Sequence, residues 1–202
     1  MIKKFLLKMM PRQQHNGGFT LIEMMIVIAI VGIAASIGVP NLMLWFDNLS
    51  VKSAARDLYS AMQEARMIAV RQNASTAIVF DTANSSYYIC SDSGDGNWDS
   101  AGDMTGTGDN VIERRVSLLS PTYKNRVQFG NGNATKDATI TEGTNFDDFI
   151  TYTSNFLVVN SRGIGTPGYV YLTNPNTGTA YAVGTRSSGL IRLVRWNGTT
   201  WQ

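Results

Sequence analysis

The chain is poor in the side chains on which most catalytic and metal sites depend. Of its 202 residues, one is cysteine and one is histidine. A single cysteine excludes an intramolecular disulfide. Cys90 lies in the apolar and aromatic stretch 87–90, where we expect a buried, unreactive thiol. His15 precedes all the features described below, so the chain beyond it has no histidine for a Ser–His or Cys–His pair or for a zinc site. We therefore expect neither an enzyme nor a cofactor.

Acidic residues are also absent from both ends of the chain. All fifteen lie between Glu23 and Asp148. Four basic residues precede Gly18 with no acid among them: Lys3, Lys4, Lys8 and Arg12. Losing these four charges would take the formal net charge from +2 to −2, so the basic balance belongs to the N-terminal segment alone.

Beyond Asp148 the only charged residues are arginines: Arg162, Arg186, Arg192 and Arg195. Such a one-sided charge distribution has two readings. The arginines form either a local patch that faces an anion or four solvated side chains on strands.

The longest feature that is present is an apolar run from Phe19 to Phe46, 28 residues whose one charge is Glu23. About 20 helical residues cross a hydrocarbon core of about 30 Å, so this run predicts a membrane-spanning helix. Gly38 and Pro40 fall inside it and predict a helix break, with bending or local melting outside the membrane. A carboxylate in such a segment costs at least a few kcal/mol and is functional by default.

The residues around the start of the run differ from a standard signal peptide. The small-residue site Gly17-Gly18 precedes the main apolar run, so cleavage there would leave the helix on the protein. Basic residues before it keep that end on the cytoplasmic side.

The string Gly18-Phe19-Thr20-Leu21-Ile22-Glu23 resembles the prepilin cleavage and methylation motif of type IV pilins and type II secretion pseudopilins. The resemblance implies that an inner-membrane prepilin peptidase cuts after Gly18 and methylates the new amino terminus, Phe19. It also implies that Glu23 attracts the amino terminus of a neighbouring subunit during assembly, an attraction that is strong in a medium of low dielectric constant.

After the run, apolar residues recur at helical spacing from Val51 to Ala69, which predicts that one amphipathic helix continues to about Gln72. From Ser75 the pattern indicates strands. We expect them at 76–80, 85–91, 111–119, 126–129, 149–159, 168–173, 179–184 and 190–196. This predicts an α+β, pilin-like fold in which the long helix packs on an antiparallel head domain. The predicted parts are a leader (1–18), a membrane and assembly segment (19–46) and a head (47–202).

Two C-terminal segments indicate which group within these families the chain resembles. Residues 158–163 and 188–193 resemble the GspH/FimT group of minor pseudopilins and minor pilins, which often ends in a Gly-Arg-x-Arg motif. Gly189 and Arg192 match that motif, and Leu190 replaces its first arginine. The resemblance implies a structural subunit that primes or caps a type II secretion pseudopilus or a type IV pilus. The alternative is a DNA-binding minor pilin of an uptake pilus, in which Arg186, Arg192 and Arg195 would contact DNA or a partner.

An aspartate-rich segment invites comparison with a calcium loop. Asp95, Asn97, Asp99 and Asp103 occupy positions one, three, five and nine of an EF-hand. Position six is Ser100 instead of glycine and position twelve is Gly106 instead of glutamate, so we expect a solvated loop and no metal.

The partners implied by the resemblance are other pilins or pseudopilins, the prepilin peptidase and the inner membrane. The implied location is the bacterial inner membrane, crossed once, with the head in the periplasm and the subunit later in a filament.

Overall fold

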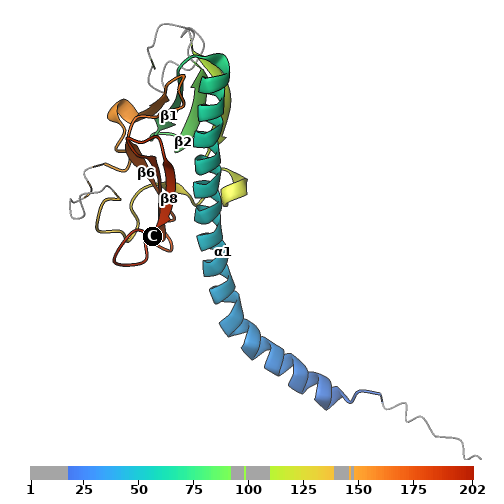
Figure 1. The fold of residues 1–202 in the computed structure, drawn as a ribbon. Helices are drawn as coiled ribbons and strands as arrows, with labels where there is room; N and C mark the ends of the chain where they lie inside the picture. The colour runs from blue at the N-terminus through green and yellow to red at the C-terminus, as the bar shows by residue number, and fades with distance from the viewer. Residues whose placement is uncertain (1–17, 92–97, 99–109, 139–145, 147) are drawn as a thin grey trace, which may run out of the picture. The chain divides into compact units, whose positions relative to one another are not determined.

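In the computed structural model the chain divides into two compact units, residues 1–41 and 42–202. The structure describes residues 18–91, 98, 110–138, 146 and 148–202. The helix α1 (Leu21–Gln72) runs through both units, and all strands belong to the second unit, which we call the head (Figure 1).

The C-terminal end of α1 is where the sequence predicted it. Asn73 adopts a left-handed conformation with φ of 52°. The Asn73 N–H donates to the Val70 carbonyl at 3.4 Å, and the Ala74 N–H donates to the Ala69 carbonyl at 3.2 Å. These two bonds form a Schellman motif, which satisfies carbonyl groups that have no partner inside the helix.

The helix continues across Gly38 and Pro40, so the predicted break is not an interruption of α1. Pro40 has no N–H to donate to the Ser36 carbonyl. Next to these residues, the Asn41 Nδ2 donates to the Ile37 carbonyl at 3.3 Å, and the Ser36 Oγ donates to the Ile33 carbonyl at 2.7 Å. Bending or melting in another environment stays a prediction.

The head contains two antiparallel four-stranded sheets, in the orders β3-β2-β1-β5 and β4-β6-β7-β8. The strands are β1 (Thr76–Asp81), β2 (Ser86–Ser91), β3 (Val111–Ser117), β4 (Gln128–Phe129), β5 (Phe156–Val159), β6 (Gly168–Thr173), β7 (Ala180–Thr185) and β8 (Ile191–Arg195). Two short 3-10 helices complete the head, η1 (Pro121–Tyr123) and η2 (Thr153–Asn155).

The core lies between α1 and one face of each sheet. The predicted helical stripe is buried from Val51 to Ala69 and packs on apolar side chains from both sheets. The sheets contribute Ile78, Phe80, Tyr87, Ile89, Val170, Leu172, Tyr181 and Val183. The α+β head with a helix packed on antiparallel sheet is therefore confirmed.

One strand prediction is wrong in extent. The expected strand at 149–159 is a strand only from Phe156 to Val159, because η2 precedes it. Ser154 and Asn155 have φ values of 57° and 60°, which a pleated strand does not accommodate. The turn places Tyr152 against Phe80, where the two rings stack with centroids 5.9 Å apart.

Candidate functional site

The first turn of α1 is fixed by a hydrogen bond to a threonine side chain. Thr20 is the residue before the helix, and its Oγ1 accepts the N–H of Glu23 at 3.2 Å. The Thr20 carbonyl accepts the N–H of Met24, also at 3.2 Å. Thr20 is thus the N-cap and Glu23 the third helical residue. Sequence reasoning did not assign Thr20, although the Thr-x-x-Glu spacing of a capping box is visible in the sequence.

Glu23 combines an exposed position with an unpaired charge. Among the described residues its carboxylate has no ion-pair partner, and the next basic residue along the chain after it is Lys52. A negative charge in the first turn is favoured by the partial positive charge of the helix N-terminus. The cap therefore fixes the backbone that carries Glu23, and no cation of the described residues occupies its carboxylate.

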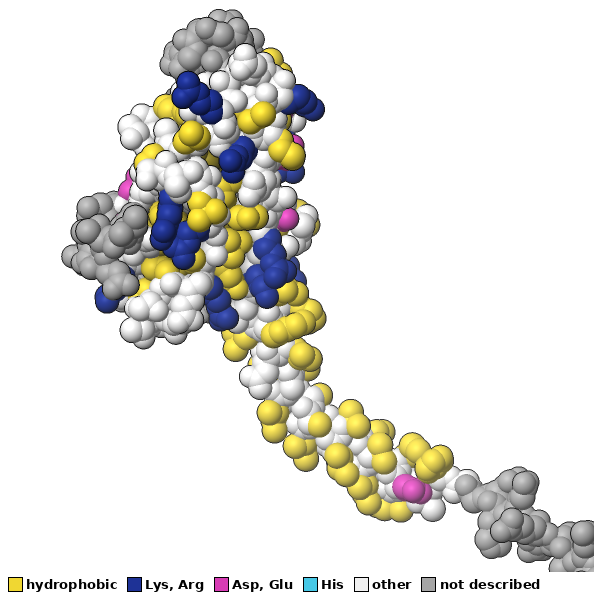
Figure 2. Space-filling view, viewed as in Figure 1, with side chains coloured by type: hydrophobic (Ala, Val, Ile, Leu, Met, Phe, Trp, Pro, Cys, Tyr) yellow, Lys and Arg dark blue, Asp and Glu magenta, His cyan; other side chains and the backbone are white. Residues whose placement is uncertain are grey.

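The apolar side chains that follow Glu23 all lie on the surface of this subunit. No apolar side chain between Phe19 and Phe46 is buried, and Ile28 and Ile33 are 70% and 66% exposed. Figure 2 shows hydrophobic side chains along this part of the helix. In the described part of the chain, α1 is the one helix that is long and apolar enough to cross a membrane.

Two glycines of this segment have no packing role within the subunit. A Cβ added at Gly32 or Gly38 would meet no atom within 4 Å. Glycine in a helix interior is destabilising relative to alanine. Small residues do, however, let membrane helices approach one another closely. These positions are accordingly suited to contact with other helices.

Polar contacts hold the next part of α1 to the head. Asp47 is 4% exposed, and both of its carboxylate oxygens accept from Nη1 of Arg126, at 2.6 and 2.7 Å. Further along, the Tyr123 hydroxyl donates to Asp57 at 2.7 Å, and Arg114 pairs with Glu64 at 3.0 Å. The helix is thus attached to the β3–β4 region at three levels.

The four C-terminal arginines do not form one group. Arg186 and Arg192 line the same pocket, whereas Arg195 lines a different depression beside Thr179 and Gly198. Arg162 is exposed in a loop. Leu190, which stands at the first arginine position of the Gly-Arg-x-Arg motif, is 56% exposed.

Cys90 is fully buried, as expected, among Ala77, Val79, Tyr88 and Trp98 on the outer face of the first sheet. Burial raises the pKa of its thiol to about 12. A thiol of this kind is not a nucleophile at neutral pH.

The calcium candidates Asp95, Asn97, Asp99 and Asp103 lie outside the described residues. Within the residues that are described, no group of three or more His, Cys, Asp or Glu side chains could hold a metal ion.

Two family models match this chain, one at the start of α1 and one over most of the head. Residues 13–39 match the prokaryotic N-terminal methylation motif. Residues 54–189, more than half of the chain, match the family described as type II transport protein GspH. The chain belongs to the GspH family.

Two solved structures are similar to this GspH-family chain. Both are of the minor pseudopilin EpsH from the type II secretion system of Vibrio cholerae, and each shares 15% sequence identity with it. One match covers 72% of this chain and 97% of EpsH with a TM-score of 0.46; the other covers 71% and 92% with a TM-score of 0.44. A search among curated proteins found no match.

The candidate site residues of this GspH-family chain fall differently with respect to the two matches. The methylation motif includes Gly18, Phe19, Glu23 and Gly38. The GspH match ends at Gly189, so Arg192, Arg195 and the last two tryptophans lie beyond it. The N-terminal site is therefore the part shared with a general motif, and the C-terminal surface must be interpreted from its own geometry.

Proposed function

We propose that the chain is a minor pseudopilin, a non-enzymatic structural subunit that joins a type II secretion pseudopilus through α1. The observation that carries this proposal is the carboxylate of Glu23, which has no ion-pair partner among the described residues, at the start of an exposed apolar helix in a chain of the GspH family. The subunit alone leaves the apolar side chains exposed and pairs the charge with no cation of the described residues, whereas a filament of packed helices would use both features.

Processing after Gly18 would make Phe19 the first residue and Glu23 the fifth. The new amino group, methylated on Phe19, is then a cation that the Glu23 of a neighbouring subunit can pair with. Pairing removes the cost of an uncompensated charge in apolar surroundings, which is at least a few kcal/mol. The exposed apolar side chains would be covered by neighbouring helices, with Gly32 and Gly38 as points of close approach.

The same features support a route to the filament. The basic residues before Gly18 keep the amino end in the cytoplasm, α1 crosses the inner membrane, and the head folds in the periplasm. A prepilin peptidase would cut after Gly18, and other pseudopilins would then take up the subunit.

The family description favours secretion over a type IV pilus. The DNA-binding alternative gains no support, because Arg195 lies apart from Arg186 and Arg192 and Leu190 supplies no charge.

The test separates the charge of Glu23 from its place in the helix. Glu23→Gln keeps a capping-box residue at the third helical position but removes the charge. We expect this variant to enter the membrane and to be processed normally. Its amount in sheared filaments, relative to processed subunit, should fall at least about tenfold, as one lost ion pair in low dielectric requires.

Thr20→Val is the matched control, because it removes the cap and leaves the charge. It should reduce incorporation much less than Glu23→Gln. Equal incorporation of Glu23→Gln and the wild-type chain would contradict the pairing role.

A further inference from the structure

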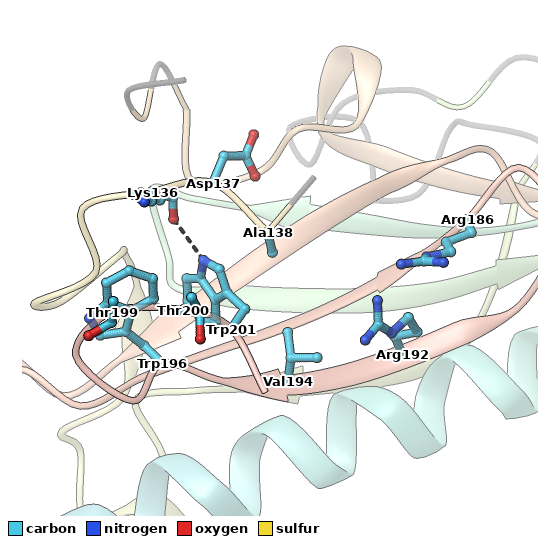
Figure 3. A pocket seen from close by; sticks show the side chains of 10 residues that line it. All are labelled: Lys136, Asp137, Ala138, Arg186, Arg192, Val194, Trp196, Thr199, Thr200 and Trp201. Carbon is cyan, nitrogen blue, oxygen red and sulfur yellow. Dashed lines mark hydrogen bonds between the residues drawn. The ribbon is translucent and has the colours of Figure 1, made fainter. Parts of the chain in front are cut away.

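A pocket of about 210 Å³ lies on the face of the second sheet that points away from α1. Its basic residues are Lys136, Arg186 and Arg192, and its aromatic residues are Trp196 and Trp201 (Figure 3). This volume is below the roughly 300–1,000 Å³ that is typical of small-molecule sites. The pocket therefore suits a single side chain better than a cofactor.

Strand alternation aims Arg192 into this pocket. Ile191 and Leu193 belong to the core that faces α1, and Val194 belongs to the cluster on the other face. Arg192 shares the face of Val194, because every second side chain points the same way. Across the ladder its partner is Gly184, where an added Cβ would lie 2.6 Å from the ring of Tyr169. The missing side chain at Gly184 leaves room for that ring next to Arg192.

Arg186 reaches the same pocket from the turn after β7. Its N–H donates to the Leu190 carbonyl at 3.0 Å, and its carbonyl accepts the Gly189 N–H at 2.8 Å. Gly189 has a φ of 77°, which favours glycine at this turn position. The backbone that carries Arg186 is thus fixed by two hydrogen bonds.

The two arginines face one another, and no carboxylate of the described residues pairs with either of them. Figure 3 shows their guanidinium groups pointing toward each other at one end of the pocket, with Asp137 at the other end. Within the described residues neither arginine is in an ion pair, and the buried Nε of Arg186 has no hydrogen-bond partner. The carboxylate of Asp137 accepts a hydrogen bond from the hydroxyl of Tyr171. Two like charges and an unsatisfied donor are together unfavourable unless a ligand supplies acceptors.

The aromatic wall of the pocket is held in place by the C-terminal residues. The Trp201 Nε1 donates to the Lys136 carbonyl at 2.7 Å, and the rings of Trp196 and Trp201 are 5.4 Å apart. Gln202 exchanges two backbone hydrogen bonds with Arg195, of 2.6 and 2.9 Å. A fixed apolar wall beside two guanidinium groups strengthens their attraction for a negative charge.

We propose that this pocket binds the carboxylate of an Asp or Glu side chain presented by an acidic segment of a partner protein. A carboxylate between the two guanidinium groups would accept hydrogen bonds from their N–H groups and cancel their repulsion.

Nucleic acid fits this pocket less well than a carboxylate side chain. Trp196 is only 7% exposed, and the Trp201 ring packs against the rings of Tyr171 and Trp196 with centroids 5.4 Å apart in each pair, which leaves little aromatic face for base stacking. The chain without its leader segment also has a formal charge of −2.

The experiment measures binding of a fluorescein-labelled hexapeptide of alternating Glu and Asp to the full-length processed protein in detergent micelles. The titration is made at low ionic strength by fluorescence anisotropy. We expect Arg186→Gln and Arg192→Gln each to weaken binding at least about tenfold, the range for one charge-assisted hydrogen bond. The matched peptide of Gln and Asn should bind much more weakly than the acidic one.

Arg195→Gln is the matched control, since Arg195 is on the same strand but outside the pocket. It should change peptide affinity less than about twofold, which is the effect of a distant screened charge. The melting temperature of each variant shows that a loss of binding is not a loss of folding; both pocket variants should melt at or above the wild-type temperature, because a repulsion is removed.

Three outcomes would overturn the proposal. They are no binding of the acidic peptide, an equal loss in Arg195→Gln, and preferential binding of a short DNA duplex that Arg186→Gln and Arg192→Gln abolish. The last result would assign the pocket to nucleic acid.

Discussion

The two halves of α1 are built for different surroundings although they form one helix. Between Phe19 and Phe46 no apolar side chain is buried, whereas between Val51 and Ala69 one stripe of apolar side chains is fully or nearly fully buried, with Met67 outside the stripe and 66% exposed. The first half has Glu23 as its one charge, and the second has charged side chains on its remaining faces. The second half thus gains its stability from the folded head, and under the proposed function the first half would gain its stability from a membrane or from neighbouring helices.

Asp47 marks the change between the two halves. It is the first buried residue of α1, and its carboxylate is paired with Arg126 on the chain between η1 and β4. Nearby, the hydroxyl of Thr179 donates to Asn48 at 2.6 Å. The strands and loops of the head therefore form hydrogen bonds with the helix at the first polar residues after the apolar run, Asp47 and Asn48.

The largest effect should follow from a change before the apolar half. Gly18→Leu should abolish processing, because a bulky side chain keeps the backbone away from the peptidase. The retained leader would be detected by mass spectrometry of the membrane-inserted protein. Gly38→Leu is the control: a Cβ at either glycine meets no atom within 4 Å in the subunit, so both variants should fold. Normal processing of Gly18→Leu would remove the cleavage assignment.

The second-largest effect is a loss of unfolding free energy, and it should differ between an apolar residue of the buried half and one of the exposed half. Leu58 is fully buried and Ile33 is 66% exposed. Leu58→Ala should lower the free energy of unfolding of the head by about 2–5 kcal/mol, the usual range for a buried leucine. Ile33→Ala should leave it within about 0.5 kcal/mol. Denaturant unfolding of the processed protein in detergent, followed by near-UV circular dichroism, measures both. A similar loss in the two variants would show that the halves do not differ as described.

The smallest effect should follow from removing the ion pair between Asp47 and Arg126, which lies where the two halves of α1 meet. Arg126→Met leaves the buried Asp47 carboxylate without its partner and should destabilise the head by about 1.5–3 kcal/mol. The side chain of Arg126 is 46% exposed, so the lower end of this range is expected. Asp47→Asn and the double variant complete a double-mutant cycle. Additive effects of the two substitutions would mean that the ion pair contributes nothing to stability.

The sequence predicted the elements whose signal is local. The helix end at Gln72 and the strands expected at 76–80, 85–91, 168–173 and 179–184 depend on local periodicity, and the structure has them within a residue or two. Thr20 also had a local signal that was not used. The strand expected from Phe149 was misjudged because residues 149–152 are as apolar as a strand, and only the positive φ values at Ser154 and Asn155 interrupt it.

The contacts that are distant in sequence were beyond such reasoning. Nothing in the sequence pairs Asp47 with Arg126, 79 residues away. Likewise, the uptake-pilin alternative treats Arg186, Arg192 and Arg195 as one contact surface. Strand alternation puts Arg192 and Arg195 at different sites, and that depends on which face of β8 meets the core.

The burial of Cys90 has a practical consequence for labelling. It is the only cysteine of the chain and is 0% exposed, with its thiol protonated at neutral pH. A cysteine introduced at an exposed position would therefore be the single thiol that reacts with a maleimide, without prior replacement of the native one. A series of such positions along residues 19–46 would report, one dye or cross-link at a time, which side of the helix each neighbour occupies.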